Sequence, residues 1–430
     1  MNFEHLLTSI STIIWNIFLP ILVVIAFLVW PKIIFKIKNL VTEKSTPTLK
    51  QAVGPISISL GAMVGTGAIV GVLGAINKLP AGVKPEAIAI WSLVGMLVML
   101  PLIYSEVIVT KVMKKSPKEY ISMFISPKAG VLYGFGFMIL YVFGFGGFQF
   151  SGISDVVNTL TVNYFDFELS SMQLYLMVVM PLFAFSSIII LTKKHELFIN
   201  VLTVMITTAV GVYIIFLVVF LVRTSDFSLV YLANLKKELL DPTSIAIGLP
   251  VGFLFGLQRI IQTSEAGLGG LAMSSLESDS EPRAAAIIAI IPSLITIIIA
   301  ILGTTYIASY GIEMGIMSEG ATSLDGFFKT ANAVTGTIGV IVLVIFTVLS
   351  GLTTLIGSYY FVDLLMVYTQ NQKIALYMVL IFVAGTLAVF GFSIVFDVID
   401  LLMFVVTGLN VVALFIFTRK HWEKYRLENK

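Results

Sequence analysis

Long apolar stretches recur along the whole chain, and short polar segments separate them. A helix needs about 20 mostly apolar residues to cross roughly 30 Å of hydrocarbon. Eleven windows meet this requirement, so the pattern predicts an all-α polytopic membrane protein with about 11 transmembrane helices. The predicted spans cover residues 11–36, 52–77, 86–110, 130–160, 172–192, 196–222, 245–263, 284–309, 336–367, 374–391 and 395–418.

Lysine and arginine are unevenly distributed between the two alternating sets of loops. One set holds 20 of the 26 basic residues, among them Lys114, Lys115, Lys193 and Lys194. Loops rich in lysine and arginine remain in the cytoplasm. We therefore expect a multi-pass protein of the cell (plasma) membrane, with its N-terminus outside and its C-terminus in the cytoplasm.

The composition agrees with a membrane protein and excludes several kinds of chemistry. Charged residues make up 12% of the chain, about half of the ~25% found in soluble domains. The absence of cysteine excludes disulfides, Cys-ligated zinc and iron–sulfur clusters. A net charge of +2 without a basic tract argues against a nucleic-acid partner. His5, His195 and His421 all lie in predicted loops or termini, so no catalytic pairing is visible inside the spans and no enzyme is expected.

Glycines interrupt the second and seventh spans more than any other pair of spans. Six glycines lie between Gly54 and Gly74, and six between Gly248 and Gly270. A five-helix unit that begins at each of these spans gives two units of opposite orientation, because five is an odd number. The expected parts are an extra N-terminal helix with its linker (1–45), a first repeat (46–222), a second repeat (223–418) and a cytoplasmic tail (419–430).

Broken spans at matching positions of two repeats predict a transporter site near the membrane midplane. Unwound backbone there offers N–H groups to anions and carbonyl groups to cations. Close helix packing through small residues is the alternative interpretation of the same glycines.

Several segments resemble the alanine or glycine:cation symporters, which form the sodium:alanine symporter family. The most specific is Thr263–Gly269, TSEAGLG, which is similar to the family signature FSNEAGLGS. The other segments are Gly61–Val72, similar to a GTGN-type broken helix, Pro85–Val107, Gln149 with Asp155, and Thr353–Tyr360, close to STILGWYYY. The resemblance covers about residues 50–365 and implies a LeuT-type fold of five plus five helices, preceded by one extra helix.

Four places depart from the family pattern. Two of them are Lys84–Glu86, which replaces a Gly-Gly-Pro-Gly turn, and Ser358, which replaces a tryptophan. Ala68 stands where the family carries an asparagine that can ligate a sodium ion touching the substrate carboxylate. Ser264 replaces the asparagine of the signature.

The broken second span supplies the predicted substrate site. Gly65, Thr66 and Gly67 can leave N–H groups free, and these groups would hold a carboxylate without a buried lysine or arginine. Gln149 lies in an aromatic, glycine-rich helix where its amide needs a partner. Its family position implies substrate contact, and interhelical packing is the alternative. Phe253 is a candidate for the wall of an apolar side-chain pocket.

Thr353 and Thr354 place two adjacent hydroxyl groups inside an apolar span. Each hydroxyl could bond back to a carbonyl one turn earlier in its own helix. The family resemblance implies a different use, in which the two hydroxyls join the carbonyls of Gly61, Val64 and Ser350. These five oxygens suit a hard cation such as sodium.

Ionisable groups in or beside membrane spans are rare and usually functional. Glu106, Arg259 and Glu265 all fall at predicted cytoplasmic ends of helices. We expect them to form an inner-gate network of ion pairs, and solvated helix ends are the alternative.

These patterns together predict a sodium-coupled symporter of a small neutral amino acid, alanine or glycine, that works by alternating access around helices 2 and 7. The expected partners are the amino-acid substrate, sodium and the lipid bilayer. The alternative is a related transporter of another small solute, or one coupled to protons with Glu106 or Asp155 as the carrier.

Overall fold

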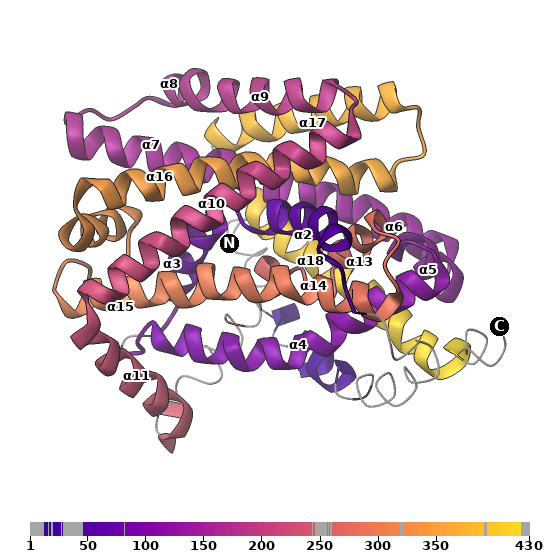
Figure 1. Ribbon diagram of the computed structural model, residues 1–430, viewed down its shortest axis with the longest axis horizontal. Helices are drawn as coiled ribbons and strands as arrows, with labels where there is room; N and C mark the ends of the chain where they lie inside the picture. Colours follow the sequence, from indigo (N-terminus) through magenta and orange to yellow (C-terminus); the bar gives the residue numbers. More distant parts are fainter. Residues whose placement is uncertain are drawn as a thin grey trace.

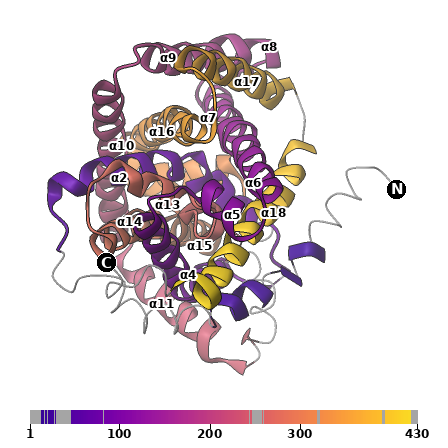
Figure 2. The same ribbon diagram turned by 90° about the vertical axis from the view of Figure 1, so that its right-hand side faces the viewer.

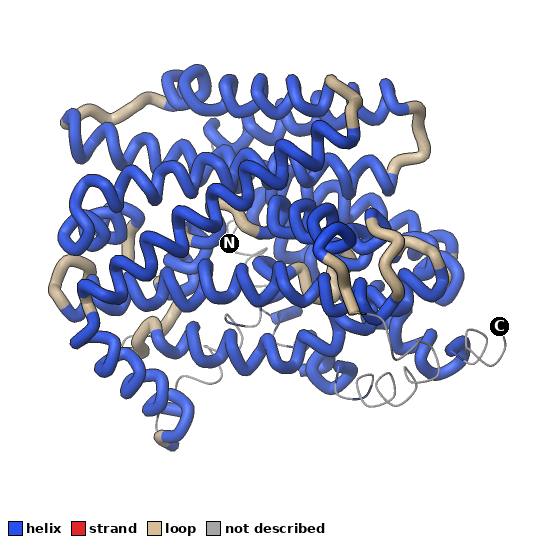
Figure 3. The backbone as a smooth tube through the Cα atoms, viewed as in Figure 1, coloured by secondary structure: helices blue, strands red, loops and turns tan. Residues whose placement is uncertain are grey.

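The computed structural model is helical throughout the part of the chain that it describes (Figure 3). The described residues are 13–15, 17–18, 20–26, 28, 46–80, 82–242, 244–245, 256, 258, 260–318, 322–390 and 394–422. Within them, 8 helices are long and apolar enough to cross a membrane, and a bent pair of helices makes up to 9. The prediction of an all-α multi-pass membrane protein is confirmed. The predicted spans 11–36 and 245–263 fall partly or largely outside the described residues.

Most predicted spans correspond to single helices or to helices that continue through a π-helical turn. The elements are α2 (Leu49–Met63), η1 (Thr66–Ala68), α3 (Val70–Ile76), α4 (Glu86–Met113), α5 (Pro117–Phe124), α6 (Pro127–Ile139), η2 (Leu140–Gly146), α7 (Gly147–Phe165), α8 (Ser171–Leu174), η3 (Tyr175–Val179), α9 (Met180–Leu191), α10 (His195–Arg223), α11 (Ser225–Leu240), α13 (Gly270–Ser274), η4 (Ser275–Glu277), α14 (Pro282–Thr296), η5 (Ile297–Gly303), α15 (Thr304–Glu313), α16 (Leu324–Leu365), α17 (Gln370–Phe390), α18 (Ile394–Ile416) and η6 (Phe417–His421).

The helices form layers around α2. Figures 1 and 2 show α8, α9 and α17 on one side of the molecule and α4 with α11 on the opposite side. Only 28% of the most apolar window is buried in the α8–α9 span and in α17, against 61% in the α14–α15 span and in α16. The outer pair therefore presents most of its apolar surface to lipid. α2 packs against α10, α14 and α16, so the broken helix lies in the centre.

The two ends of the bundle carry different short helices. α5 and the starts of α6 and α10 lie at the right-hand end in Figure 1, whereas α11 lies at the other end. We call the right-hand end the basic end, because it carries Lys114, Lys115, Lys128, Lys193 and Lys194. Its assignment to the cytoplasm, and the domain limits at 45, 222 and 418, stay predictions.

Short helices occupy matching places in the two repeats. α5 follows the second span of the first repeat and starts with a capping box, in which Ser116 N donates to Glu119 Oε2 at 2.7 Å and Pro117 takes the first helical position. Residues 324–335 hold the corresponding place in the second repeat, at the opposite end of the bundle. Gly336, with φ 69° and ψ −173°, separates them from the rest of α16. This agrees with the predicted start of a span at residue 336.

Candidate functional site

The second span is broken in its middle, as the glycines predicted. α2 ends at Met63, and the helix axis turns by 65° before α3. Val64 and Gly65 between them are extended, with φ and ψ of −85° and 99° and of −133° and −162°. The residues of the break are buried except for Gly67, which is partly accessible. The break therefore exposes unpaired backbone groups inside the protein rather than to lipid.

Gln149 on α7 caps the N–H side of the break. Its Oε1 accepts hydrogen bonds from the Thr66 backbone N–H at 2.7 Å and from the Thr66 hydroxyl at 3.0 Å. Its Nε2 donates to the Phe145 carbonyl at 3.0 Å, which fixes the orientation of the amide. One of the three N–H groups predicted to hold a carboxylate is therefore already engaged by Gln149.

The two glycines beside Thr66 differ in the space around them. A Cβ added to Gly65 would overlap the Gln149 amide, with Nε2 only 2.7 Å away, so only glycine fits there. A Cβ added to Gly67 would meet only Phe148 Cε1, at 3.6 Å, among the described residues. Within the same residues, the N–H groups of Gly65 and Gly67 have no hydrogen-bond acceptor. Two unused donors and a position that tolerates a small side chain thus lie together at this side of the break.

The carbonyl side of the break faces the two threonines of α16. The Thr354 hydroxyl lies 3.0 Å from the Gly61 carbonyl, 3.1 Å from the Ser350 carbonyl and 3.5 Å from the Val64 carbonyl. The Thr353 hydroxyl lies 2.8 Å from the Ser350 carbonyl. The five residues are buried, and Thr353 and Thr354 have no exposed surface.

These contacts bring the predicted oxygen ligands together. The Thr354 hydroxyl reaches across to α2 and also bonds back within α16, whereas the hydrogen bond of the Thr353 hydroxyl stays within α16. The carbonyls of Gly61 and Val64 belong to the last turn of α2, where no helical N–H follows to engage them. The negative end of a half-helix and neutral hard oxygens are the environment that a sodium ion prefers.

Side-chain hydroxyl groups donate hydrogen bonds to backbone carbonyls at and near Ala68 and Ser264. The Thr304 hydroxyl on α15 donates to the Ala68 carbonyl at 2.8 Å. Ser264 Oγ donates to the Ile260 carbonyl at 2.5 Å, and Ser293 Oγ donates to the Ser264 carbonyl at 3.2 Å. Thr304 was missed in the sequence analysis, although a Thr-Thr pair inside an apolar span was the same signal that identified Thr353 and Thr354.

The signature segment before α13 has a non-helical backbone. Glu265, Gly267 and Gly269 have positive φ angles of 52°, 78° and 96°. Gly269 also lies against Pro117, whose Cγ would be 2.9 Å from an added Cβ. The glycines of the signature therefore allow a left-handed chain path and close packing on α5.

The predicted gating residues are only partly described. Glu106 and Glu265 are both fully buried, so they are not solvated helix ends. Neither carboxylate forms an ion pair within the described part of the chain. Arg259 and Phe253 lie outside the described residues. The ion-pair network therefore stays a prediction.

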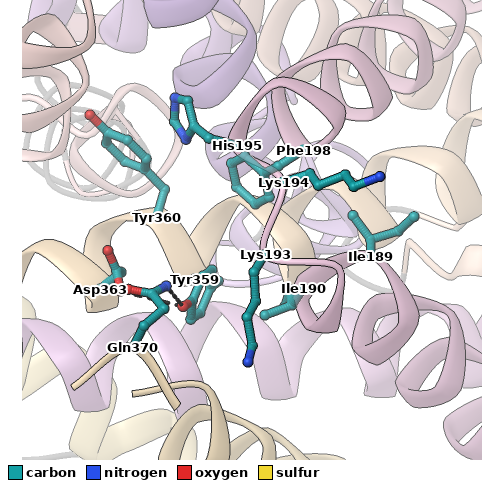
Figure 4. Close-up of a pocket in the computed structure, with 10 residues that line it drawn as sticks. All are labelled: Ile189, Ile190, Lys193, Lys194, His195, Phe198, Tyr359, Tyr360, Asp363 and Gln370. Carbon is teal, nitrogen blue, oxygen red and sulfur yellow. Dashed lines mark hydrogen bonds between the residues drawn. The ribbon is translucent and has the colours of Figure 1, made fainter. Parts of the chain in front are cut away.

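A separate pocket of about 90 Å³ lies at the basic end, between the α9–α10 connection and the end of α16. Figure 4 shows Gln370 bonded to Tyr359 on one side, at 2.7 Å, while Lys193 and Lys194 point in different directions. Lys193 Nζ donates to Asn371 Oδ1 at 2.6 Å. No residue of the break lines this pocket, which is therefore distinct from the candidate site.

Comparisons with known proteins agree with this geometry. A solved structure of a Na⁺-coupled sialic acid symporter, in a substrate-bound outward-open state, matches with a TM-score of 0.56 at 15% sequence identity. The match covers 94% of this chain and 86% of that chain, which shows that the fold is shared. No curated protein matches the sequence. The profile of the sodium:alanine symporter family matches residues 1–427. The chain therefore belongs to the sodium:alanine symporter family.

Proposed function

We propose that this sodium-coupled symporter carries a small neutral amino acid, alanine or glycine, by alternating access around its broken helices. The observation that carries the proposal is the break in helix 2, which offers two unused N–H groups on one side and a cluster of oxygens on the other. An amino acid and sodium carry the opposite charges that these two sides can bind.

The substrate carboxylate binds the N–H groups of Gly65 and Gly67. The partial accessibility of Gly67 supports this position, and Phe148, 3.6 Å from an added Cβ, favours a small side chain. Gln149 Oε1 accepts two hydrogen bonds from Thr66, which use both of its lone pairs. A substrate ammonium would therefore take the place of the Thr66 hydroxyl as a donor to this oxygen. Phe253 is proposed as part of the apolar wall.

Sodium binds between α2 and α16, at the carbonyls of Gly61, Val64 and Ser350 and the hydroxyls of Thr353 and Thr354. In this place the ion ties the inner half of the broken helix to α16. Release of sodium frees α2 from this contact, which couples the ion to the change of access. The basic end faces the cytoplasm of the cell in this proposal, with the C-terminus there and the N-terminus outside.

Uptake into proteoliposomes tests the proposal. Labelled alanine and glycine should accumulate when an inward sodium gradient is imposed, and a potassium gradient of equal size is the control. A panel of larger and charged amino acids should accumulate less. Accumulation driven by a proton gradient without sodium, or of a solute that is not an amino acid, would support the alternative transporter instead.

A further inference from the structure

A second buried polar cluster lies towards the basic end and takes no part in the proposed sodium and substrate sites. Its members come from α4, α5, α6, η2, α18 and the segment before α13. We call it the acid cluster, and it consists of Glu106, Tyr120, Tyr133, Tyr141, Glu265 and Asn410. All six side chains have no exposed surface.

Asn410 organises one half of the acid cluster. Its Nδ2 donates to Glu106 Oε2 at 2.9 Å and to the Gly267 carbonyl at 2.9 Å. Its Oδ1 accepts the Tyr120 hydroxyl. The amide is therefore fully used and can offer Glu106 only one donor. Glu106 Oε1 has no hydrogen-bond partner.

Glu265 forms the other half of the acid cluster and has fewer hydrogen-bond partners than Glu106. Neither of its carboxyl oxygens has a hydrogen-bond partner, and the Tyr141 hydroxyl also has none. Both groups lie against Gly270, where an added Cβ would overlap Glu265 Oε2 and come within 2.6 Å of the Tyr141 hydroxyl. The carboxyl and the phenol are thus neighbours in a closed space.

No described cationic side chain compensates these two carboxyls. Lys111, on the same helix as Glu106, directs its Nζ to the carbonyls of Ser278 and Ser275, at 2.5 and 3.4 Å. The other polar groups around the pair are Tyr120 from α5, Tyr133 from α6, Tyr141 from η2 and the backbone of Gly269. Thr110 lies beside Tyr120, and Thr407 lies beside Gly267. Two ionised carboxylates in such a place would lose their hydration and repel each other.

One added proton would supply a hydrogen-bond donor to the carboxyl oxygens of Glu106 and Glu265 that lack one. A protonated carboxyl is neutral and adds an O–H donor, which a neighbouring carboxylate or phenol oxygen can accept. We propose that Glu106 and Glu265 together hold one proton in the conformation of the structure. The proton leaves when the segment before α13 separates from α4 and α18 and water reaches the carboxyls. This rests on the proposed alternating access, because that movement is what opens the cluster.

The proposal makes the protein sensitive to protons as well as to sodium. Proton binding would hold the segment that carries Gly267 and Glu265 against α18, through Asn410. Transport should then depend on the cytoplasmic pH, separately from the dependence on sodium.

Glu265→Gln is the main test, because glutamine has the shape of the carboxyl and cannot titrate. Two measurements are made on the full-length protein: sodium-driven alanine uptake in proteoliposomes at a series of internal pH values, and proton release on addition of sodium and alanine in weakly buffered detergent solution. The unmodified protein should show a change in uptake of roughly threefold or more across the pH series and release about one proton per molecule. Glu265→Gln should flatten the pH profile and release none, and Glu265→Asp should retain both.

Two further variants keep the outcome interpretable. Tyr141→Phe removes the neighbouring hydroxyl without changing the packing and should shift the midpoint of the pH profile, which tests the cluster if Glu265→Gln does not fold.

Asp325→Asn removes a carboxylate that is 41% exposed and paired with Lys329, and it should behave as the unmodified protein. No proton release from the unmodified protein, or an identical pH profile in Glu265→Gln, would overturn the proposal and indicate compensation by a cation such as Arg259. Uptake that is absent from the unmodified protein as well as from every variant would instead contradict the proposed function.

Discussion

The two sides of the break in helix 2 differ in what already occupies them. On the carbonyl side, a side chain from α16 reaches three backbone oxygens, because Thr354 lies within 3.5 Å of all of them. On the N–H side, Gln149 engages Thr66 and leaves Gly65 and Gly67 unused. The first side is a cluster of oxygens that already contact one another, whereas the second is backbone with two N–H groups that have no acceptor among the described residues.

This difference predicts how each side responds to substitution. The carbonyl side should be sensitive to loss of hydroxyl groups, since few polar atoms complete the oxygen set. The N–H side should be sensitive to added volume, since its donors belong to the backbone and cannot be removed by changing a side chain.

The largest effect is expected for Gly67→Val on the N–H side. Gly67 does not have a positive φ, and the nearest described atom to an added Cβ is 3.6 Å away, so the fold should accept a side chain. A β-branched residue there would restrict the unwound backbone and fill the space in front of the donors. Alanine uptake should be lost while the amount of protein in the membrane is unchanged.

Gly67→Ala is the matched control, because it adds one methyl group and should retain part of the uptake. If Gly67→Val shows the uptake kinetics of the unmodified protein, the glycines of the break serve close helix packing and do not bind substrate.

Thr354→Val tests the carbonyl side. The substitution keeps the shape of the side chain and removes the hydroxyl that contacts α2 and α16. The sodium concentration for half-maximal uptake should rise by roughly 100-fold, equivalent to about 2.7 kcal/mol. Sodium titration of alanine uptake measures this value. Thr354→Ser keeps the hydroxyl and should remain close to the unmodified protein, and equal sodium dependence in the valine and serine variants would remove Thr354 from the site.

Thr353→Ala should have a smaller effect on the same side. Among the described residues its hydroxyl donates only to the Ser350 carbonyl of its own helix, at 2.8 Å, so we expect it to add one ligand without bridging the helices. We expect the sodium concentration for half-maximal uptake to rise by roughly tenfold, equivalent to ~1.4 kcal/mol. The same sodium titration checks it, and a larger loss than in Thr354→Val would reverse the order of importance of the two threonines.

Gln149→Ala should weaken alanine binding more than sodium binding, by roughly fivefold in apparent affinity, equivalent to ~1 kcal/mol. The amide caps Thr66 N–H and contacts none of the predicted sodium ligands, so its loss changes only the N–H side. Michaelis constants for alanine and for sodium, determined in parallel, separate the two effects. An equal change in both would show that Gln149 supports the whole break.

The sequence predicted those features that depend on local patterns. The length of apolar runs located most spans, and glycines located the break between Met63 and Val70. The turn at Gly336 was not predicted as a turn, although a span was predicted to start at this residue. The five predicted sodium ligands also lie together. The family resemblance implied this set, because the residues alone also allowed the two hydroxyls to bond back within their own helix.

Contacts between distant side chains could not be predicted in the same way. The Thr66 N–H bonds to a residue 83 positions further along the chain, and Asn410 bonds to a carboxyl 304 positions away. Such pairs depend on helix rotation and rotamers, which hydropathy does not specify. Asn410 nevertheless gave a signal, as a single amide inside an apolar span, and α11 gave none because it is not long or apolar enough to be predicted as a span.

The smallest effect is expected at Ala68, beside the N–H side of the break. The methyl group of Ala68 cannot ligate a cation. Its carbonyl is already bonded to the Thr304 hydroxyl, at 2.8 Å. Within the described residues we therefore propose one set of sodium ligands, around Thr354, and we expect about one sodium per alanine. The reversal potential of the alanine-driven current, followed as external sodium and alanine are varied, gives this ratio.

Thr304→Val should leave the ratio and the sodium dependence nearly unchanged, because Thr304 contacts a backbone carbonyl outside the proposed site. Ala68→Asn adds the missing side-chain oxygen and should move the ratio towards two. A ratio of two in the unmodified protein would mean that a second sodium binds without a side-chain ligand at position 68, and that the contrast between the two sides of the break has been drawn too sharply.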